Sequence, residues 1–318
     1  MGYPKEVYQA VKDYYEIHQH DAKNERDFRR KQIYDKLPKV EAIDKEIQKI
    51  GHSLLELDLS QDNGKKEVEK RRNLVMDLTR ERHNVLESAG YEKDFLDIKY
   101  SCPLCNDTGV VGTEYCKCFQ DALKKEAFRS ANLPIMMDEQ SFDTFRIDAY
   151  PDEEQESMTT VFAVCKEFSQ DFNAGTKENL YLYGAPGLGK TFLSSCIAKE
   201  VIEKGYGVFY QPAYKIFRIF EDYKFNQENK SINKYHIDKI MNSDLLIIDD
   251  LGAEMATAYT AEVLFDLINT RINEKRPTII NTNLDFPDLE TIYSARITSR
   301  ILGNFTLLEF NGEDLRGM

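Results

Sequence analysis

The sequence predicts an α/β fold, in which helices cover both faces of a parallel β-sheet, preceded by a helical region and a small cysteine-rich segment. Short apolar segments typical of strands alternate with helical segments in the carboxyl-terminal half of the 318-residue chain. This alternation is typical of parallel sheets that are covered on both faces. The first hundred residues hold 20 Lys and Arg and 21 Asp and Glu, whereas the whole chain has a net charge of −13. We therefore expect a boundary near residue 100.

A glycine-rich loop follows the first predicted strand. Residues 180–183 are apolar and β-prone, residues 192–199 are helical in character, and the loop between them fits the pattern G-x-x-x-x-G-K-[ST]. Glycines in such a loop let successive backbone N–H groups surround a polyphosphate at the amino terminus of the helix. We expect Lys190 to reach the β- and γ-phosphates of ATP and the Thr191 hydroxyl to ligate Mg²⁺; a chance match is the alternative. The loop consists of Gly184, Ala185, Pro186, Gly187, Leu188, Gly189, Lys190 and Thr191.

Two acidic residues follow a second predicted strand. Residues 245–248 are all apolar, as in a central strand that is buried on both faces, and Asp249 and Asp250 come directly after them. We expect Asp249 to hold Mg²⁺, directly or through water, and Asp250 to polarise the water that attacks the γ-phosphate. The start of a polar loop is the alternative. Paired carboxylates favour hydrolysis of ATP over transfer of phosphate to a small molecule.

The remaining predicted elements complete the sheet. They are strands at residues 207–210, 277–280 and 306–310 and a helix at residues 258–273. Ligands of such sheets bind at the carboxyl ends of the strands, and Asn281 and Asn283 lie at one of these ends. We expect Asn283 to hydrogen-bond the γ-phosphate or the attacking water, with Asn281 as the second candidate. A polar turn without such a role is the alternative.

Two arginines share one face of a later predicted helix. Arg296 and Arg300 are four positions apart, so their guanidinium groups lie on the same side. In an ATPase that works as a ring or spiral, such an arginine enters the nucleotide site of the neighbouring subunit and neutralises charge on the γ-phosphate. We expect Arg300 to act as this arginine finger, with Arg296 as its partner or replacement. An ordinary solvated helix face is the other interpretation.

Residues from about 140 to 316 resemble the AAA+ P-loop ATPase domain of bacterial replicative-helicase loaders of the DnaC/DnaI type, and of the related IstB-type transposition helper ATPases. The resemblance rests on the glycine-rich loop, the Asp249-Asp250-Leu251-Gly252 run, Thr282-Asn283-Leu284 and the stretch from Arg296 to Arg300. It implies an AAA+ fold that binds and hydrolyses ATP. Most AAA+ proteins carry a helical lid after the last strand, but only eight residues follow Phe310. We therefore expect no full carboxyl-terminal lid.

Four of the six cysteines lie within 17 positions. Cys102 and Cys105 form one pair and Cys116 and Cys118 another, on either side of a short segment that contains glycine. Two such pairs are typical of a tetrahedral Zn²⁺ site with four thiolate ligands. Disulfides and an iron–sulfur cluster are the alternatives. Because nothing at the amino terminus resembles a signal peptide, we expect a cytoplasmic protein in a reducing compartment, where disulfides are rare.

The front of the chain is expected to be helical. Apolar residues recur there at alternating spacings of three and four, which predicts two antiparallel helices joined by a turn at residues 62–64. We expect a helical domain over residues 1–99, a zinc knuckle over 100–120, a linker over 121–150 and the ATPase domain over 151–318. The apolar positions are Val40, Ile43, Ile47, Ile50, Leu54 and Leu57, followed by Val68, Val75, Leu78 and Val85.

A contact with single-stranded DNA must be local, because an acidic chain with a pI of about 5.0 repels nucleic acid overall. Residues 210–224 interleave aromatic and basic side chains, and Lys215 and Arg218 are candidates for this contact. A core-facing stripe with a solvated edge is the alternative.

The resemblance implies a particular set of partners. These are a hexameric replicative helicase of the DnaB type, held by the amino-terminal region, single-stranded DNA, and further copies of the chain through their ATPase domains. A helical hairpin with only a structural role is the alternative for the front of the chain. For the whole chain, a transposition helper ATPase and a small-molecule kinase are the alternative functions.

Overall fold

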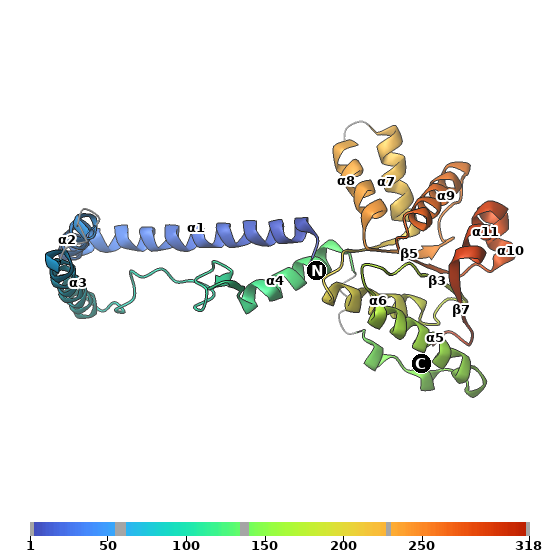
Figure 1. The fold of residues 1–318 in the computed structure, drawn as a ribbon, viewed down its shortest axis with the longest axis horizontal. Coiled ribbons are helices and arrows are strands. Elements are labelled where there is room, and N and C mark those ends of the chain that lie inside the picture. Colours follow the sequence, from blue (N-terminus) through green and yellow to red (C-terminus); the bar gives the residue numbers. More distant parts are fainter. Residues whose placement is uncertain (1–2, 55–61, 134–139, 227–229, 316–318) are drawn as a thin grey trace. The chain divides into compact units, whose positions relative to one another are not determined.

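A computed structural model describes residues 3–54, 62–133, 140–226 and 230–315. The chain divides into two compact units. One, here called the helical unit, is Lys12–Phe119; the other, here called the sheet unit, combines Met1–Val11 with Gln120–Met318. Figure 1 shows the helices and strands of both units. None of the described helices is both long and apolar enough to cross a membrane.

The sheet unit contains a five-stranded sheet whose strand order is β4-β5-β6-β3-β7. Every neighbouring pair in this sheet is parallel. All five predicted strands are confirmed. Because β6 lies between β5 and β3, the carboxyl ends of these three parallel strands lie at the same edge of the sheet. The strands are β3 (Asn179–Gly184), β4 (Val208–Pro212), β5 (Leu245–Leu251), β6 (Thr278–Thr282) and β7 (Phe305–Phe310).

Helices cover both faces of this sheet, as the sequence predicts (Figure 1). Successive side chains of a strand point to opposite faces. In β5, Leu246 and Ile248 therefore join a core shared with α7, α9 and α11, while α5 and α6 lie on the other face. The helices of this unit include α5 (Asp152–Asp171), α6 (Lys190–Glu203), α7 (Ala213–Phe225), α8 (Lys230–Asn242), α9 (Ala258–Asn273), α10 (Phe286–Ile292) and α11 (Ala295–Asn304).

The helical unit contains one helix more than the sequence predicts. Besides α2 (Pro38–Leu54) and α3 (Asp62–Ser88), it contains most of a 32-residue helix α1 (Lys5–Lys36), whose first residues belong to the sheet unit. The predicted turn at residues 62–64 is wrong, because these residues begin α3; Asp and Asn favour helix starts as well as turns. Residues 55–61, which include the predicted core residue Leu57, lie outside the described part of the chain.

A buried carboxylate joins the three helices of this unit. Asp44 of α2 is only 4% exposed. It accepts hydrogen bonds from Arg30 and Tyr34 of α1, at 3.3 and 2.6 Å, and from Arg82 of α3 at 3.1 Å. A buried charge is tolerated only when such partners replace its hydration. An apolar cluster that includes Ile33, Val40 and Leu86 completes the packing.

The units do not follow the predicted domain boundaries. Residues 121–150, expected to form a linker, include most of α4 (Lys117–Ser130), whose Leu123 and Ala127 are buried. The backbone N–H of Tyr210 in β4 donates to the carbonyl of Ala131 at 3.0 Å. The described residues of this segment therefore belong to the sheet unit, together with the first eleven residues of the chain.

Arg271, the arginine of α9, is buried and hydrogen-bonds three backbone segments. Arg271 has no exposed surface, and it donates to the carbonyls of Ile240, Ser243 and Pro277 at 3.0, 3.2 and 2.7 Å. It also donates to the Thr278 hydroxyl at 2.9 Å. Burial lowers the pKa of Arg271 to about 9, which still leaves the side chain charged at neutral pH.

We predict that Arg271→Met lowers the free energy of unfolding of the sheet unit by at least about 3 kcal/mol, because several buried carbonyls lose their donors at once. Equilibrium urea unfolding measures this change. The matched control is Arg218→Met, whose side chain is 78% exposed and whose loss changes stability by about 0.5 kcal/mol or less. Equal effects of the two substitutions would contradict a structural role for Arg271.

Candidate nucleotide site and cysteine cluster

The glycine-rich loop joins β3 to α6 in a conformation that requires its glycines. Gly184, Gly187 and Gly189 have φ values of 136°, 81° and 87°, in the region that side chains with a Cβ rarely adopt. A Cβ added to Gly184 would lie 2.2 Å from the carbonyl oxygen of Phe310. Helix α6 begins at Lys190, directly after the loop. The predicted strand–loop–helix is therefore confirmed, and the positive end of the helix dipole lies at the loop.

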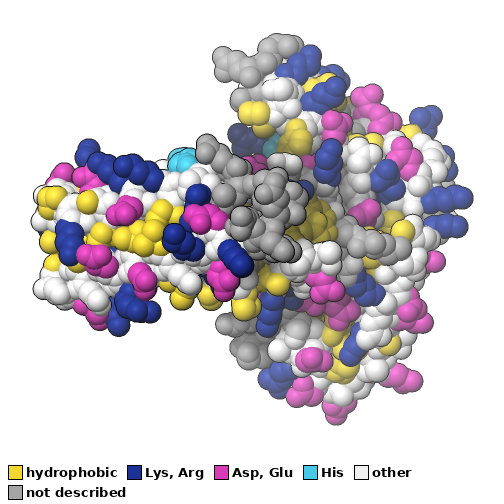
Figure 2. Space-filling view, turned by 60° about the vertical axis from the view of Figure 1, so that its left-hand side comes forward, with side chains coloured by type: hydrophobic (Ala, Val, Ile, Leu, Met, Phe, Trp, Pro, Cys, Tyr) yellow, Lys and Arg dark blue, Asp and Glu magenta, His cyan; other side chains and the backbone are white. Residues whose placement is uncertain are grey.

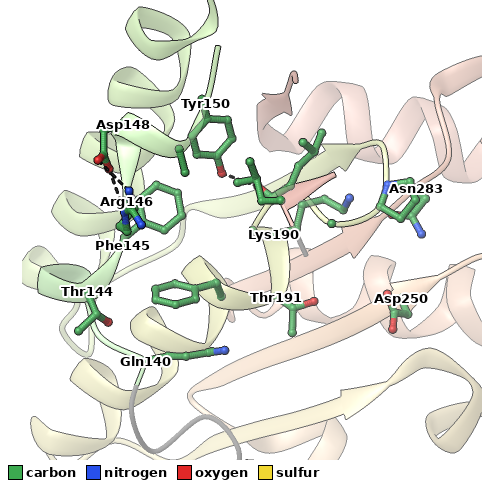
Figure 3. Close-up of a pocket in the computed structure, with 17 residues that line it drawn as sticks. Gln140, Thr144, Phe145, Arg146, Asp148, Tyr150, Lys190, Thr191, Asp250 and Asn283 are labelled. Atoms are coloured by element: carbon green, nitrogen blue, oxygen red, sulfur yellow. Dashed lines mark hydrogen bonds and ion pairs between the residues drawn. The ribbon is translucent and has the colours of Figure 1, made fainter. Parts of the chain in front are cut away.

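The loop forms one wall of a cavity of about 860 Å³. Lys190 and Thr191 come from the start of α6, Asp250 from β5, and Asn283 from the residue after β6 (Figure 3). Four side chains that the sequence assigns to ATP therefore meet at the carboxyl ends of the strands. Residues 140–150 provide a further part of the lining through Gln140, Thr144, Phe145, Arg146, Asp148, Ala149 and Tyr150.

The wall formed by residues 140–150 was not predicted. Phe145 lies 5.5 Å from Phe192 and 6.0 Å from Tyr150, measured between ring centroids. The Tyr150 hydroxyl donates to the carbonyl of Leu188 at 2.7 Å. Burial raises the pKa of Tyr150 to about 12, so this phenol stays a donor at neutral pH. These rings give the cavity an apolar part beside the loop, which suits a flat base.

Lys190 is held against the loop that it follows. Its side chain is only 6% exposed, and Nζ donates to the carbonyls of Gly184 and Ala185, both at 2.7 Å. The ammonium group is thus already fixed within the loop whose N–H groups surround the expected phosphates. A positive charge in this place attracts a polyphosphate.

Asp249 lies behind the cavity rather than in its wall. Its carboxylate is 5% exposed and accepts hydrogen bonds from the hydroxyls of Thr191 at 3.1 Å and Tyr210 at 2.6 Å. Asn281 adds a third side-chain donor at 2.8 Å. The contact with Thr191 brings together the two residues that were expected to hold Mg²⁺. An acidic oxygen and a hydroxyl are ligands that this ion accepts.

The structure separates the two asparagine candidates. Asn283 is exposed and lines the cavity, as does Asp250. Asn281 is 1% exposed and contacts Asp249 instead. Asp250 has a φ of 51°, at a shift in the pairing of β5 with β6 between Ile248 and Leu251. This irregularity gives the adjacent carboxylates different surroundings, with Asp249 buried and Asp250 exposed in the cavity wall.

The two arginines of α11 are not part of this cavity. Arg296 and Arg300 are both exposed, and neither is among the described residues that line the cavity. Ile297 and Ile301 of the same helix are buried. The helix therefore packs through its apolar face and leaves both guanidinium groups on the surface.

The four predicted cysteines come together in the helical unit. The sulfur atoms of Cys102, Cys105, Cys116 and Cys118 all lie within 4.8 Å of one another. The Sγ distances are 3.9 Å for Cys102 and Cys116 and 3.5 Å for Cys105 and Cys118. Zn–S bonds of about 2.3 Å in a tetrahedron place sulfur atoms about 3.8 Å apart. The cluster therefore fits a four-thiolate metal site, and all four thiols are free of disulfides.

Residues between the cysteine pairs, and others from α1, contact this cluster and its loop. Between the cysteine pairs, β1 (Val110–Val111) and β2 (Glu114–Tyr115) form a small antiparallel hairpin. The Asp107 carboxylate accepts from the backbone N–H of Cys102 at 2.7 Å. From α1, Gln19 donates to the Asp107 carbonyl at 2.8 Å. Burial and a hydrogen bond to Cys118 raise the pKa of Tyr15 of α1, so its phenol remains a donor to the sulfur.

Known proteins resemble the part of the chain that contains the cavity. The replicative helicase loader DnaC of Buchnera aphidicola subsp. Baizongia pistaciae is 28% identical over 177 residues, which cover 55% of this chain and 69% of the relative. The replicative helicase loader DnaI of Bacillus subtilis is 27% identical over 176 residues, covering 50% of this chain and 55% of the relative. A crystal structure of the DnaC helicase loader matches 56% of this chain and all of its own, with a TM-score of 0.48 and 24% identity.

The sequence pattern of one family extends over most of the sheet unit. The pattern described as "IstB-like ATP binding protein" matches residues 124–316, from α4 past the last strand. These residues include the glycine-rich loop, both acidic residues of β5 and the residues around Asn283. The chain therefore belongs to the IstB-like ATP-binding protein family.

Proposed function

We propose that this protein is an ATP-dependent helicase loader that binds a hexameric replicative helicase in the cytoplasm and helps to place it on single-stranded DNA. The observation that carries the proposal is the cavity in which Lys190, Thr191, Asp250 and Asn283 meet, in a chain whose relatives are named replicative helicase loaders. ATP binding and hydrolysis act as the switch between the bound and released states.

The cavity residues suit hydrolysis of ATP in distinct roles. Lys190 neutralises the β- and γ-phosphates, and the apolar part of the cavity receives the base. Thr191 and Asp249 would hold Mg²⁺, which would supply charge neutralisation on the phosphate oxygens. Asp250 accepts a proton from the attacking water, and Asn283 positions that water or the γ-phosphate. Arg300, with Arg296 as its partner or replacement, completes the site of a neighbouring copy when ATPase domains associate.

Helix α7 is our candidate for the contact with single-stranded DNA. Its Ile216 and Phe217 are buried in the core, whereas Tyr214, Lys215 and Arg218 are exposed. The expected stripe is thus divided into a packed face and an aromatic, basic face, which suits stacking of bases and neutralisation of phosphates. On the face that Figure 2 shows, basic and acidic side chains are interspersed. A small basic site of this kind is therefore compatible with the net negative charge of the whole chain.

The helical unit is our candidate for the grip on the helicase. Helix α1 exposes three large apolar side chains, with Tyr14 at 54%, Ile17 at 60% and Phe28 at 63%. Exposed apolar side chains at helical spacing are typical of a face that binds a partner. The IstB-type transposition helper remains the second candidate, since the matching family is described as IstB-like ATP binding protein.

Within the cavity, two substitutions are expected to separate binding from hydrolysis. Asp250→Asn keeps the parental affinity for ATP and lowers kcat by about 10²- to 10⁴-fold, because the proton acceptor is lost. Lys190→Ala lowers the affinity for ATP by at least about a hundredfold, because the phosphates lose a buried charge partner. Equilibrium binding of a fluorescent ATP analogue and steady-state phosphate release measure the two effects. Parental hydrolysis by Lys190→Ala would contradict the nucleotide site.

The cysteine cluster is expected to hold one Zn²⁺ per chain. Cys105→Ser loses this metal and loosens the helical unit, while ATP binding by the sheet unit continues, because a structural metal stabilises its surroundings locally. Elemental analysis of the purified chain measures the metal. The control is Cys165→Ser, another buried cysteine, which keeps the parental zinc content. Iron in place of zinc, with visible absorption, would instead support the iron–sulfur alternative.

The full chain is expected to capture a purified DnaB-type hexamer, and substitutions on α1 are expected to weaken this capture at least about tenfold. The double variant Ile17→Ser with Phe28→Ser removes the exposed apolar surface of α1. Leu74→Ser with Met76→Ser removes exposed apolar side chains from α3 of the same unit and serves as the control. Pull-down at several concentrations measures the capture. Failure of the parent chain to retain the helicase would contradict the proposed function.

A further inference from the structure

A buried tyrosine contacts the acidic residue that is expected to hold Mg²⁺. Tyr210 lies in β4 beside β5, where the two strands pair in parallel and Pro212 lies opposite Asp249. Its side chain is 1% exposed, and its hydroxyl donates to Oδ2 of Asp249 at 2.6 Å. This hydroxyl lies outside the lining of the nucleotide cavity, so it cannot act on ATP itself.

The other carboxylate oxygen of Asp249 has its own donors. Oδ1 accepts from Thr191 at 3.1 Å, from Asn281 at 2.8 Å and from the backbone N–H of Asp250 at 3.1 Å. The amide of Asn281 also donates to Ser194 of α6 at 2.7 Å, and Ser194 in turn contacts the Tyr210 hydroxyl at 3.3 Å. These side chains come from β4, β6 and α6, so Asp249 is fixed from three directions.

The polar character of Asn281 has a cost that an apolar residue would avoid. Its Oδ1 is buried and has no hydrogen-bond partner among the described atoms. A buried acceptor without a donor is unfavourable. The side chain is therefore better explained by what its amide nitrogen does for Ser194 and Asp249 than by packing alone.

We propose that Tyr210 and Asn281 are positioning residues for Asp249, which hold its carboxylate in the orientation that binds Mg²⁺ in the presence of ATP. The inference rests on the proposed ATPase function. Tyr210 fixes Oδ2 and Asn281 fixes Oδ1, so the carboxylate cannot rotate and Oδ1 stays at the Thr191 hydroxyl. Residues that orient metal ligands in this way typically change metal affinity by about 10- to 100-fold when they are replaced.

The test compares the dependence on Mg²⁺ with the affinity for nucleotide in its absence. In the full chain, Tyr210→Phe removes one hydroxyl and is expected to raise the Mg²⁺ concentration for half-maximal hydrolysis at least about tenfold. Excess Mg²⁺ restores most of the parental kcat. Binding of a fluorescent ATP analogue in EDTA stays within about twofold of the parent, because Lys190 and the loop are unchanged.

A matched control isolates the contact with Asp249. Tyr181 of β3 is also fully buried, and its ring stacks on Phe286 at 5.7 Å. Tyr181→Phe makes the same chemical change within the same sheet and is expected to keep the parental Mg²⁺ dependence. A general loss of packing would shift both variants alike, and that result would overturn the proposal.

The outcomes also separate this inference from the proposed function. Parental Mg²⁺ dependence in Tyr210→Phe would overturn the positioning role while leaving the ATPase intact. Absence of Mg²⁺-dependent hydrolysis in the parent chain would instead overturn the proposed function. If Tyr210→Phe fails to fold by circular dichroism, Asn281→Ala tests the same prediction. An unchanged Mg²⁺ dependence in that variant then rejects the proposal.

Discussion

The sheet unit depends on how one buried carboxylate is satisfied. Asp249 ends the apolar run of β5, and a charge in such a place is tolerated only with several donors around it. Those donors come from Thr191 on α6, Tyr210 on β4 and Asn281 on β6. Their convergence requires β5 to lie between β4 and β6, which is the observed strand order. The same contacts that stabilise the sheet thus bring the start of α6 to the expected metal ligand.

Most of the candidate nucleotide site could be predicted from the sequence because its signals are local. A strand, a glycine-rich loop and a helix follow one another between Asn179 and Glu203, and two carboxylates follow an apolar run. The roles of Asn281 and Asn283 could not be separated, since both stand where a strand ends and the burial of each depends on neighbouring elements. Phe145 and Tyr150 could not be predicted as lining residues, because an irregular segment has no periodic pattern of apolar residues.

In the helical unit, too, contacts between residues far apart in the sequence could not be predicted. Sequence spacing was sufficient to bring the four cysteines together, because the hairpin between the pairs is short. Tyr15 and Gln19 could not be connected with them, since Gln19 lies 88 positions from the Asp107 that it contacts. The long first helix was missed for a related reason. Its surface is largely polar over most of its length, and the apolar stripe that was recognised begins only at Val40.

The buried charges of Asp249 and Arg271 in the sheet unit are stabilised in different ways. Asp249 is surrounded by donors that belong to the expected nucleotide chemistry, and the position of its carboxylate matters for the metal binding that we propose. Arg271 is surrounded by backbone carbonyls that connect the end of α8 with the start of β6, and it is not among the described residues that line the cavity. A buried arginine cannot easily lose its proton, so its charge is a fixed structural requirement. Both carboxylate oxygens of Asp249 are instead held by side-chain donors, and in the proposed function the geometry of these donors determines where the expected Mg²⁺ ligand lies.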